Sequence, residues 1–150
     1  MKVVLASDHA GFEYKKELLA YLESMGMETI DVGAHSFDEN DDYPEFIANA
    51  AKEVSAHPNN TIAIILGGSG QGEAIVANKF KEVRAAVYNT HNTELITLAR
   101  QHNDANVLSL GARFITIDQA KEAVKLFLAT PFSEEDRHIR RIKQIRDYSS

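Results

Sequence analysis

The residues from Gly67 to Glu73 have the most unusual pattern in this sequence. Four glycines fall within six positions, with Ser69 and Gln71 between them. Because glycine loses more conformational freedom on folding than any other residue, such a cluster indicates backbone N–H groups that approach a ligand closely. The loop follows the β-branched apolar run Thr61–Leu66 and precedes a helical pattern. A strand, a glycine loop and a helix N-terminus together form an anion-binding cradle, although a tight strand-to-helix turn would also use glycines.

Glu73 begins the helical pattern beside this loop. A carboxylate there would repel a bound anion, so we interpret it as a base that acts where negative charge is about to form. The alternative is a favourable interaction with the helix dipole. Because N–H groups favour the carboxylate and desolvation favours the acid, the sequence leaves the protonation state of Glu73 open. The loop matches neither a dinucleotide fingerprint nor a P-loop, and its N–H groups could instead stabilise an enediolate or another oxyanion.

Three other groups of polar residues could bind or activate a substrate. Asp8 and His9 follow the first predicted strand, where they could bind an anion or a hydroxyl, or cap the first helix. His102 lies at a predicted helix end, where it could simply favour the helix dipole. Arg137 and Arg141 are four residues apart and therefore share a helix face, which could clamp a phosphate or merely be solvated.

The elements that position these residues alternate between strand and helix patterns. The predicted strands are 2–7, 28–32, 61–66, 84–87 and 107–110, and the predicted helices are 12–25, 43–56, 73–79, 92–101, 116–129 and 133–148. This alternation predicts a parallel sheet with helices on both faces, whose ligand lies beyond the carboxyl ends of the strands. We therefore expect Asp8–His9, Gly67–Glu73 and Gly111–Arg113 to lie close together. Ser133 is expected to cap the last helix.

The composition excludes several classes of protein. The chain has 150 residues, a formal net charge of −6 and no cysteine, so we expect one domain over 1–150 that attracts neither nucleic acid nor an anionic membrane. The absence of cysteine and of a signal peptide or membrane-spanning apolar run leads us to expect a cytoplasmic protein. Six histidines are scattered without the spacing of a metal site, so no metal is predicted.

Taken together, the motifs resemble those of the type B ribose-5-phosphate isomerases, a family that also includes galactose-6-phosphate and allose-6-phosphate isomerases. The resemblance runs from residue 2 to about residue 148 and rests on six segments in the family's order and spacing: Ser7–Gly11, Asp42–Pro44, Gly67–Lys79, Arg100–Asn103, Gly111–Arg113 and Arg137–Arg141. It implies a three-layer α/β/α, Rossmann-like domain with a five-stranded parallel sheet. It also implies a homodimer, sometimes further paired, with active sites shared across the interface and with no metal or organic cofactor.

The chain departs from many members of that family at one position. They have a catalytic cysteine where this chain has Gly67, and this chain has no cysteine at all. It resembles instead the subgroup in which a glutamate just after the glycine loop is the base, and Glu73 occupies that position. The role of Glu73 as the base would therefore account both for the missing cysteine and for a carboxylate beside the glycine loop.

The resemblance also implies roles for the residues that bind the substrate. Arg137, Arg141 and His9 would hold the phosphate of the sugar, and Arg113 would reach in from the partner subunit. Tyr43 and Asn103 would orient the sugar hydroxyls.

The remaining implied roles concern the reaction, which interconverts an aldose phosphate and a ketose phosphate through a cis-enediolate. His102 would protonate the ring oxygen while Asp8 accepts the hydroxyl proton, and Glu73 would move a proton between C2 and C1. The oxyanion would be held by the Ser69 hydroxyl and by the loop that comprises Gly68, Ser69, Gly70, Gln71 and Gly72. Two alternatives stay open: a hexose-6-phosphate isomerase on the same scaffold, and a non-catalytic sugar-phosphate-binding module.

Overall fold

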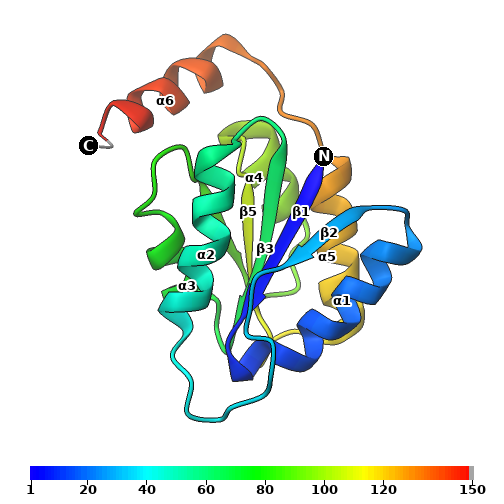
Figure 1. The fold of residues 1–150 in the computed structure, drawn as a ribbon. Helices are drawn as coiled ribbons and strands as arrows, with labels where there is room; N and C mark the ends of the chain where they lie inside the picture. The colour runs from blue at the N-terminus through cyan, green and yellow to red at the C-terminus, as the bar shows by residue number, and fades with distance from the viewer. Residues whose placement is uncertain (149–150) are drawn as a thin grey trace.

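A five-stranded parallel sheet forms the middle layer of the protein, and helices cover both of its faces (Figure 1). The computed structural model describes residues 1–148. The strands are β1 (Lys2–Ser7), β2 (Glu28–Asp31), β3 (Thr61–Gly67), β4 (Ala85–Tyr88) and β5 (Val107–Gly111). The helices are the 3₁₀ turn η1 (His9–Gly11), α1 (Phe12–Ser24), α2 (Tyr43–Ala56), α3 (Gln71–Ala77), α4 (Glu94–Asn103), α5 (Ile117–Ala129) and α6 (Asp136–Asp147). The predicted α/β/α fold is therefore confirmed.

The strand order is β2-β1-β3-β5-β4, and every pair is parallel. β3 and β5 are buried along their whole length and β1 is buried beyond Lys2, as expected for continuous apolar runs. The edge strands β2 and β4 are only partly buried. Ser7 pairs with Leu66, and Gly67 pairs with Gly111. This register brings the loops after β1, β3 and β5 to the same edge of the sheet.

Alternating side chains of the strands build two cores, one on each face of the sheet. Leu5, Leu66 and Leu110 belong to the core that the sheet shares with α1, α4 and α5. Ala6 and Ile65 belong to the core that it shares with α2 and α3. Because a strand directs successive side chains to opposite faces, each central strand contributes to both cores.

The ends of α1, α2 and α5 follow the predicted signals, whereas α3 begins and ends two residues earlier than predicted and α4 two residues later. Thr116 and Gln119 form a reciprocal capping box at the start of α5, and Gly26 follows α1 with φ +77°. The prediction that Ser133 caps the last helix is wrong, because α6 begins at Asp136 with Glu135 in the N-cap position. Glu134 has φ +59°, which prevents the helix from extending back to Ser133.

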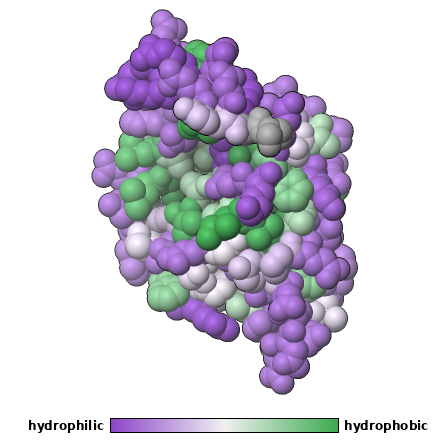
Figure 2. Space-filling model, turned by 90° about the vertical axis from the view of Figure 1, so that its left-hand side faces the viewer, coloured by the Kyte–Doolittle hydropathy of each residue, from purple (hydrophilic) through white to green (hydrophobic). Residues whose placement is uncertain are grey.

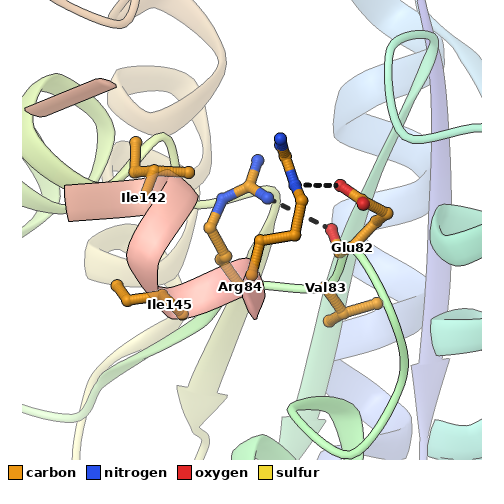
Figure 3. Close-up of a pocket in the computed structure, with 6 residues that line it drawn as sticks. Glu82, Val83, Arg84, Ile142 and Ile145 are labelled. Carbon is orange, nitrogen blue, oxygen red and sulfur yellow. Dashed lines mark hydrogen bonds and ion pairs between the residues drawn. The ribbon is translucent and has the colours of Figure 1, made fainter. Parts of the chain in front are cut away.

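Helix α6 lies outside the three layers, beyond the amino ends of the strands (Figure 1). Figure 3 shows how the segment before β4 contacts it: Arg146 Nε lies 3.1 Å from Glu82 Oε2, and Arg84 Nη1 donates to the Glu82 carbonyl. The cavity at this contact has a volume of about 20 Å³, room for about one water and far too little for a substrate. Within residues 1–148, no helix has the length and apolar character needed to cross a membrane.

Candidate active site

A cleft of about 440 Å³ opens at the carboxyl edge of the sheet, within the range of small-molecule sites. It lies between the loops after β1 and β3, which is where the strand order reverses direction. Most of the predicted site residues line it, and Ala10 and Phe114 complete the lining. The predicted residues are Asp8, His9, Tyr43, Gly68, Ser69, Gly72, Glu73 and Arg113. The loops after β1, β3 and β5 thus meet as expected.

Glu73 is buried at the floor of this cleft, with only 4% of its surface exposed. Its carboxyl group occupies the space next to Gly67, where a Cβ atom would overlap both Oε1 and Cδ of Glu73. Only a glycine at position 67 therefore accommodates the carboxyl group in this place. Burial raises the pKa of Glu73, its own backbone N–H opposes that rise, and the negative charge of Asp8 adds to it. Desolvation thus outweighs the stabilising N–H contact, which the sequence alone left undecided.

The glycine loop is fixed through its carbonyl groups. The carbonyls of Gly67 and Gly68 accept hydrogen bonds from the amides of Ala112 and Arg113 at 2.9 and 3.1 Å. Ser109 Oγ donates to the Gly70 carbonyl at 2.6 Å, and Gly70 has φ +82°, which a residue with a Cβ rarely adopts. No hydrogen bond among residues 1–148 uses the amides from Gly68 to Gly70. These amides are therefore free to bind an anionic atom of a ligand.

Not every predicted member of this loop lines the cleft. Gly70 is the N-cap residue of α3, and Gln71 is exposed as the first residue of the helix. Gly72 does line the cleft, and a Cβ there would overlap Tyr43 Oη. The glycine at position 72 thus lets the Tyr43 side chain approach the loop.

The position of Arg113 corrects one expectation. The family resemblance implied that this arginine reaches in from a partner subunit, but it lines the same cleft as Asp8 and Glu73 of its own chain, as the expected meeting of the three loops requires. A Cβ on Gly68 would lie only 3.2 Å from Arg113 Nη1. Because β5 lies next to β3, the loop after β5 must run beside the glycine loop of the same chain.

Asp8 and His9 are held in place by backbone and carboxylate contacts. Asp8 caps η1 by accepting a hydrogen bond from the Ala10 amide at 3.0 Å. His9 Nδ1 lies 2.7 Å from Asp41 Oδ1. Asp8, His9 and Asp41 are also the one group among residues 1–148 whose ligand atoms lie close enough to hold a metal ion. However, a hydrogen bond between Nδ1 and Asp41 places a proton on the nitrogen that an ion would need, so we interpret these residues as an ion-pair network.

The other predicted site residues form a second cluster, on α4 and α6. The His102 ring at the end of α4 stacks on the His138 ring of α6, with centroids 4.2 Å apart and an interplanar angle of 30°. Arg137 and Arg141 are exposed on α6, and Asn103 is exposed at the last turn of α4. Imidazole and guanidinium groups thus gather at this end of the molecule.

One chain does not bring the two clusters together. The cleft lies at the carboxyl edge of the sheet, whereas α4 ends just before β5 begins, at the amino edge. Arg84 precedes β4, and its Nε donates to the carbonyls of Asn103 and Asp104. β3 has seven residues, so the two edges are roughly 20 Å apart at roughly 3.3 Å per residue. His102, Asn103, Arg137 and Arg141 therefore cannot contact a ligand in the cleft of their own chain.

Sequence analysis missed three residues that contact these clusters. Asp41 lies in an acidic loop that gave no sign of a specific contact, because charged loop residues are usually solvated. Phe114 lines the cleft without any motif that could have indicated it. His138 could have been found from its place between the two arginines of α6, where its buried side chain contacts His102.

Comparisons with known proteins find sugar-phosphate isomerases that are similar to this chain. The family model described as Ribose/Galactose Isomerase matches residues 3–145. Ribose-5-phosphate isomerase B of Mycolicibacterium paratuberculosis is 45% identical over 99% of this chain and 91% of its own length. The enzyme of the same name from Mycobacterium tuberculosis is 41% identical over 99% and 90% of the two chains.

Solved structures of ribose-5-phosphate isomerases B have the same fold as this chain. Ribose-5-phosphate isomerase B of Mycoplasma genitalium, with bound ribulose 5-phosphate, superposes with a TM-score of 0.93 at 37% identity, covering 98% of this chain and 95% of that chain. The Clostridium thermocellum enzyme superposes with a TM-score of 0.91 at 37% identity, covering 98% and 96% of the two chains.

Proposed function

The chain belongs to the ribose/galactose isomerase family, and we propose that it interconverts ribose 5-phosphate and ribulose 5-phosphate through a cis-enediolate. The observation that carries this proposal is the buried carboxyl group of Glu73, which lies beside a glycine loop with free amides. Burial raises the pKa of Glu73, which makes its carboxylate a stronger base and suits it to remove a proton and return it.

The reaction begins with opening of the furanose ring. His102 protonates the ring oxygen, and Asp8 accepts the proton of the C1 hydroxyl as the aldehyde forms. Asp8 has the required access because it lines the cleft. Tyr43 and Asn103 hold the sugar hydroxyls, and His9, Arg113, Arg137 and Arg141 bind the phosphate group.

Proton transfer then occurs at the glycine loop. Glu73 removes the proton from C2, and the electron pair of that bond moves to give the enediolate. The free amides from Gly68 to Gly70 and the Ser69 hydroxyl stabilise the negative oxygen, and each such donor contributes about 10²–10³-fold. The proton of the C2 hydroxyl passes to O1, which leaves the negative charge on O2. Glu73 then returns its proton to C1, O2 becomes the carbonyl oxygen of the ketose, and the carboxyl group ends in its original state.

Two assays on the purified protein test this function. We expect kcat/KM to be highest for ribose 5-phosphate in a panel that includes allose 6-phosphate and galactose 6-phosphate. In ²H₂O we expect NMR to show deuterium at a carbon-bound position of the sugar, because the proton on Glu73 exchanges with solvent. A preference for a hexose phosphate would favour the alternative substrate class, and binding without turnover or exchange would indicate a non-catalytic module.

We further propose that the active enzyme is a homodimer in which each site combines the cleft of one subunit with the α4–α6 cluster of the other. This cluster comprises His102, Asn103, Arg137, His138 and Arg141. The roughly 20 Å between the two edges of the sheet supports this arrangement, because His102 and Glu73 of a single chain cannot contact the same sugar. Pairing by a twofold axis would complete both sites at once.

The surface around the edge strand β4 supports the same proposal. Ile75 on α3, Val87 on β4 and Leu95 on α4 are exposed by 64%, 37% and 48%, and their elements are neighbours. Figure 2 shows apolar residues gathered in a hollow on this side of the molecule, below hydrophilic residues. An exposed apolar face next to an unpaired strand edge is typical of a protein–protein interface.

Mixing two inactive variants tests the shared site. We expect Glu73→Gln and His102→Asn each to have little activity alone. After dissociation and reassociation of an equal mixture, half of the dimers are mixed and each contains one intact site, so about a quarter of wild-type activity should return. No recovery would contradict the shared site. Sedimentation would separately distinguish a dimer from a dimer of dimers. The absence of a cofactor and the cytoplasmic location stay predictions.

A further inference from the structure

We propose that Asp41 is a positioning residue for substrate binding: it holds the His9 ring with Nδ1 toward its own carboxylate and leaves Nε2 to donate to the phosphate group of the sugar. This inference rests on the proposed function, and it adds a residue that lies outside the motifs of the sequence. The observation behind it is a double contact between one carboxylate oxygen and one histidine.

The contact fixes both the backbone and the ring of His9. Asp41 Oδ1 accepts a hydrogen bond from the His9 amide at 3.0 Å and lies 2.7 Å from His9 Nδ1. With Nδ1 engaged as a donor, Nε2 is the ring nitrogen that is left for a ligand. His9 lines the cleft and its side chain is 25% exposed, so a phosphate group can reach the ring.

The loop that carries Asp41 is itself held in place. The Asp41 amide donates to the Asp38 carbonyl at 3.1 Å, and Asp41 is buried to the extent that only 9% of its side chain is exposed. The Phe37 ring of the same loop lies edge-on to the His9 ring, at 6.4 Å between centroids. The loop thus restricts the imidazole from two directions, which is the requirement for a preorganised ligand group.

Asp41 also determines the charge of His9. The hydrogen bond to Asp41 raises the pKa of His9, desolvation lowers it, and the negative charge of Asp8 raises it further. The positive charge of Arg113, which lines the same cleft, opposes the rise. The net effect raises the pKa of His9, so the ring stays cationic to a higher pH than a free histidine and can give a charge-assisted hydrogen bond to a phosphate group over that wider range.

The pH dependence of this contact follows from the sign of the shift. A raised pKa keeps His9 cationic to higher pH, and the contact weakens as pH rises through that pKa. Without the carboxylate of Asp41, the pKa falls and the contact is lost at lower pH. At a pH low enough to protonate His9 in either protein, the difference should largely vanish.

Asp41→Asn is the test variant, and Asp42→Asn is its matched control. Both remove one negative charge from the same loop, but Asp42 is exposed and makes no side-chain cap to α2. We expect Asp41→Asn to raise KM for ribose 5-phosphate by roughly 10- to 100-fold at pH 7.5, as for a lost charged hydrogen bond, and much less at pH 5.5. The kcat should change far less than KM, and Asp42→Asn should behave like the wild type.

Two readouts do not depend on turnover. We expect the pKa of His9, followed by NMR and assigned with a His9→Gln variant, to fall in Asp41→Asn. Inorganic phosphate should bind more weakly to Asp41→Asn at pH 7.5, so the proposal can be tested even if the protein does not isomerise ribose 5-phosphate. Thermal unfolding would show whether Asp41→Asn is misfolded. In that case the same measurements would be made on Asp41→Ala, which introduces no buried amide group.

A double-mutant cycle makes the test specific. In a His9→Gln background, Asp41→Asn should have almost no further effect on phosphate binding, because its target is absent. An equal effect in both backgrounds, or an unchanged pKa of His9, would overturn the proposal. So would a pKa that falls while phosphate affinity stays the same.

Discussion

The cleft and the α4–α6 cluster differ in how firmly they hold their polar groups. In the cleft, Asp8 and Glu73 are only 6% and 4% exposed, and the glycine loop is tied to β5 and the loop after it. In the α4–α6 cluster, Arg137 and Arg141 are exposed, and Arg137 contacts a carboxylate only two positions away, Glu135. The cleft is therefore complete within one chain, whereas the arginines project from the surface.

This difference matches what each step of the proposed reaction requires. Proton transfer needs a base whose position and pKa are fixed, because a misplacement of about 1 Å can cost about 100-fold in rate. Holding a phosphate requires positive charge, which can arrive on a separate subunit. We therefore expect changes in the cleft to lower kcat and changes on α6 to raise KM.

The largest effect should come from Glu73→Gln. Removing the proposed base should lower kcat by about 10²–10⁴-fold, with KM nearly unchanged, because the proposed phosphate contacts remain. Glu94→Gln is the control, since Glu94 also lies in the first turn of a helix but is exposed. If both variants kept near-full turnover, Glu73 would merely interact with the helix dipole.

A second large effect should come from Gly67→Ala, which leaves every functional group in place. The added Cβ would overlap the Glu73 carboxyl group and displace it, so we expect kcat to fall by about 100-fold. The double variant with Glu73→Gln should be no slower than Glu73→Gln alone, as steady-state rates would establish. A further loss in the double variant would instead indicate a damaged fold.

Arg141→Gln should raise KM by roughly tenfold and change kcat little, because it removes one of the charged contacts that we propose to the phosphate. Arg140→Gln removes the same charge from the neighbouring position, which faces a different direction on the helix. Its KM should stay close to that of the wild type. Equal increases would mean that α6 acts through its overall charge and not through a specific contact.

The acid side of the pH profile should report the pKa of Glu73. A base works when deprotonated, so kcat should fall as pH drops through a pKa that is raised above 4.5. Because the charge of Asp8 contributes to that rise, Asp8→Asn should move this side of the profile to lower pH, even though the variant is slower overall. A profile that keeps its midpoint would exclude coupling between the two carboxyl groups.

The sequence predicted the fold because its signals are local and repeat along the chain. The continuous apolar runs of β1, β3 and β5, the capping box at Thr116 and the Gly26 stop each have one simple physical interpretation. The placement of the loops at one edge followed from the rule for parallel sheets. The error at Ser133 arose because a positive φ at Glu134 has no clear sequence signal.

The site was harder to predict because its key contacts join distant residues. The Glu73 carboxyl group occupies the space that a Cβ on Gly67 would fill, and this placement depends on the direction of the Glu73 side chain. The contact between His9 and Asp41 spans 32 positions. The rule for parallel sheets placed Arg113 near Glu73, whereas the family resemblance assigned it to the partner subunit. No sequence pattern showed that His102 lies at the opposite edge of the sheet from Glu73, since that depends on where α4 ends.

The smallest expected effect concerns the anchor of α6. Arg146 pairs with Glu82 at 3.1 Å, but its side chain is 48% exposed, so the pair contributes no more than about 1 kcal/mol. Arg146→Ala should therefore raise KM less than about fivefold, since 1.4 kcal/mol corresponds to tenfold. Lys143→Ala breaks an ion pair that lies within α6 itself, with Asp147, and should leave KM unchanged. If Arg146→Ala changed KM as much as Arg141→Gln, the position of α6 would depend on this anchor and not on the partner subunit.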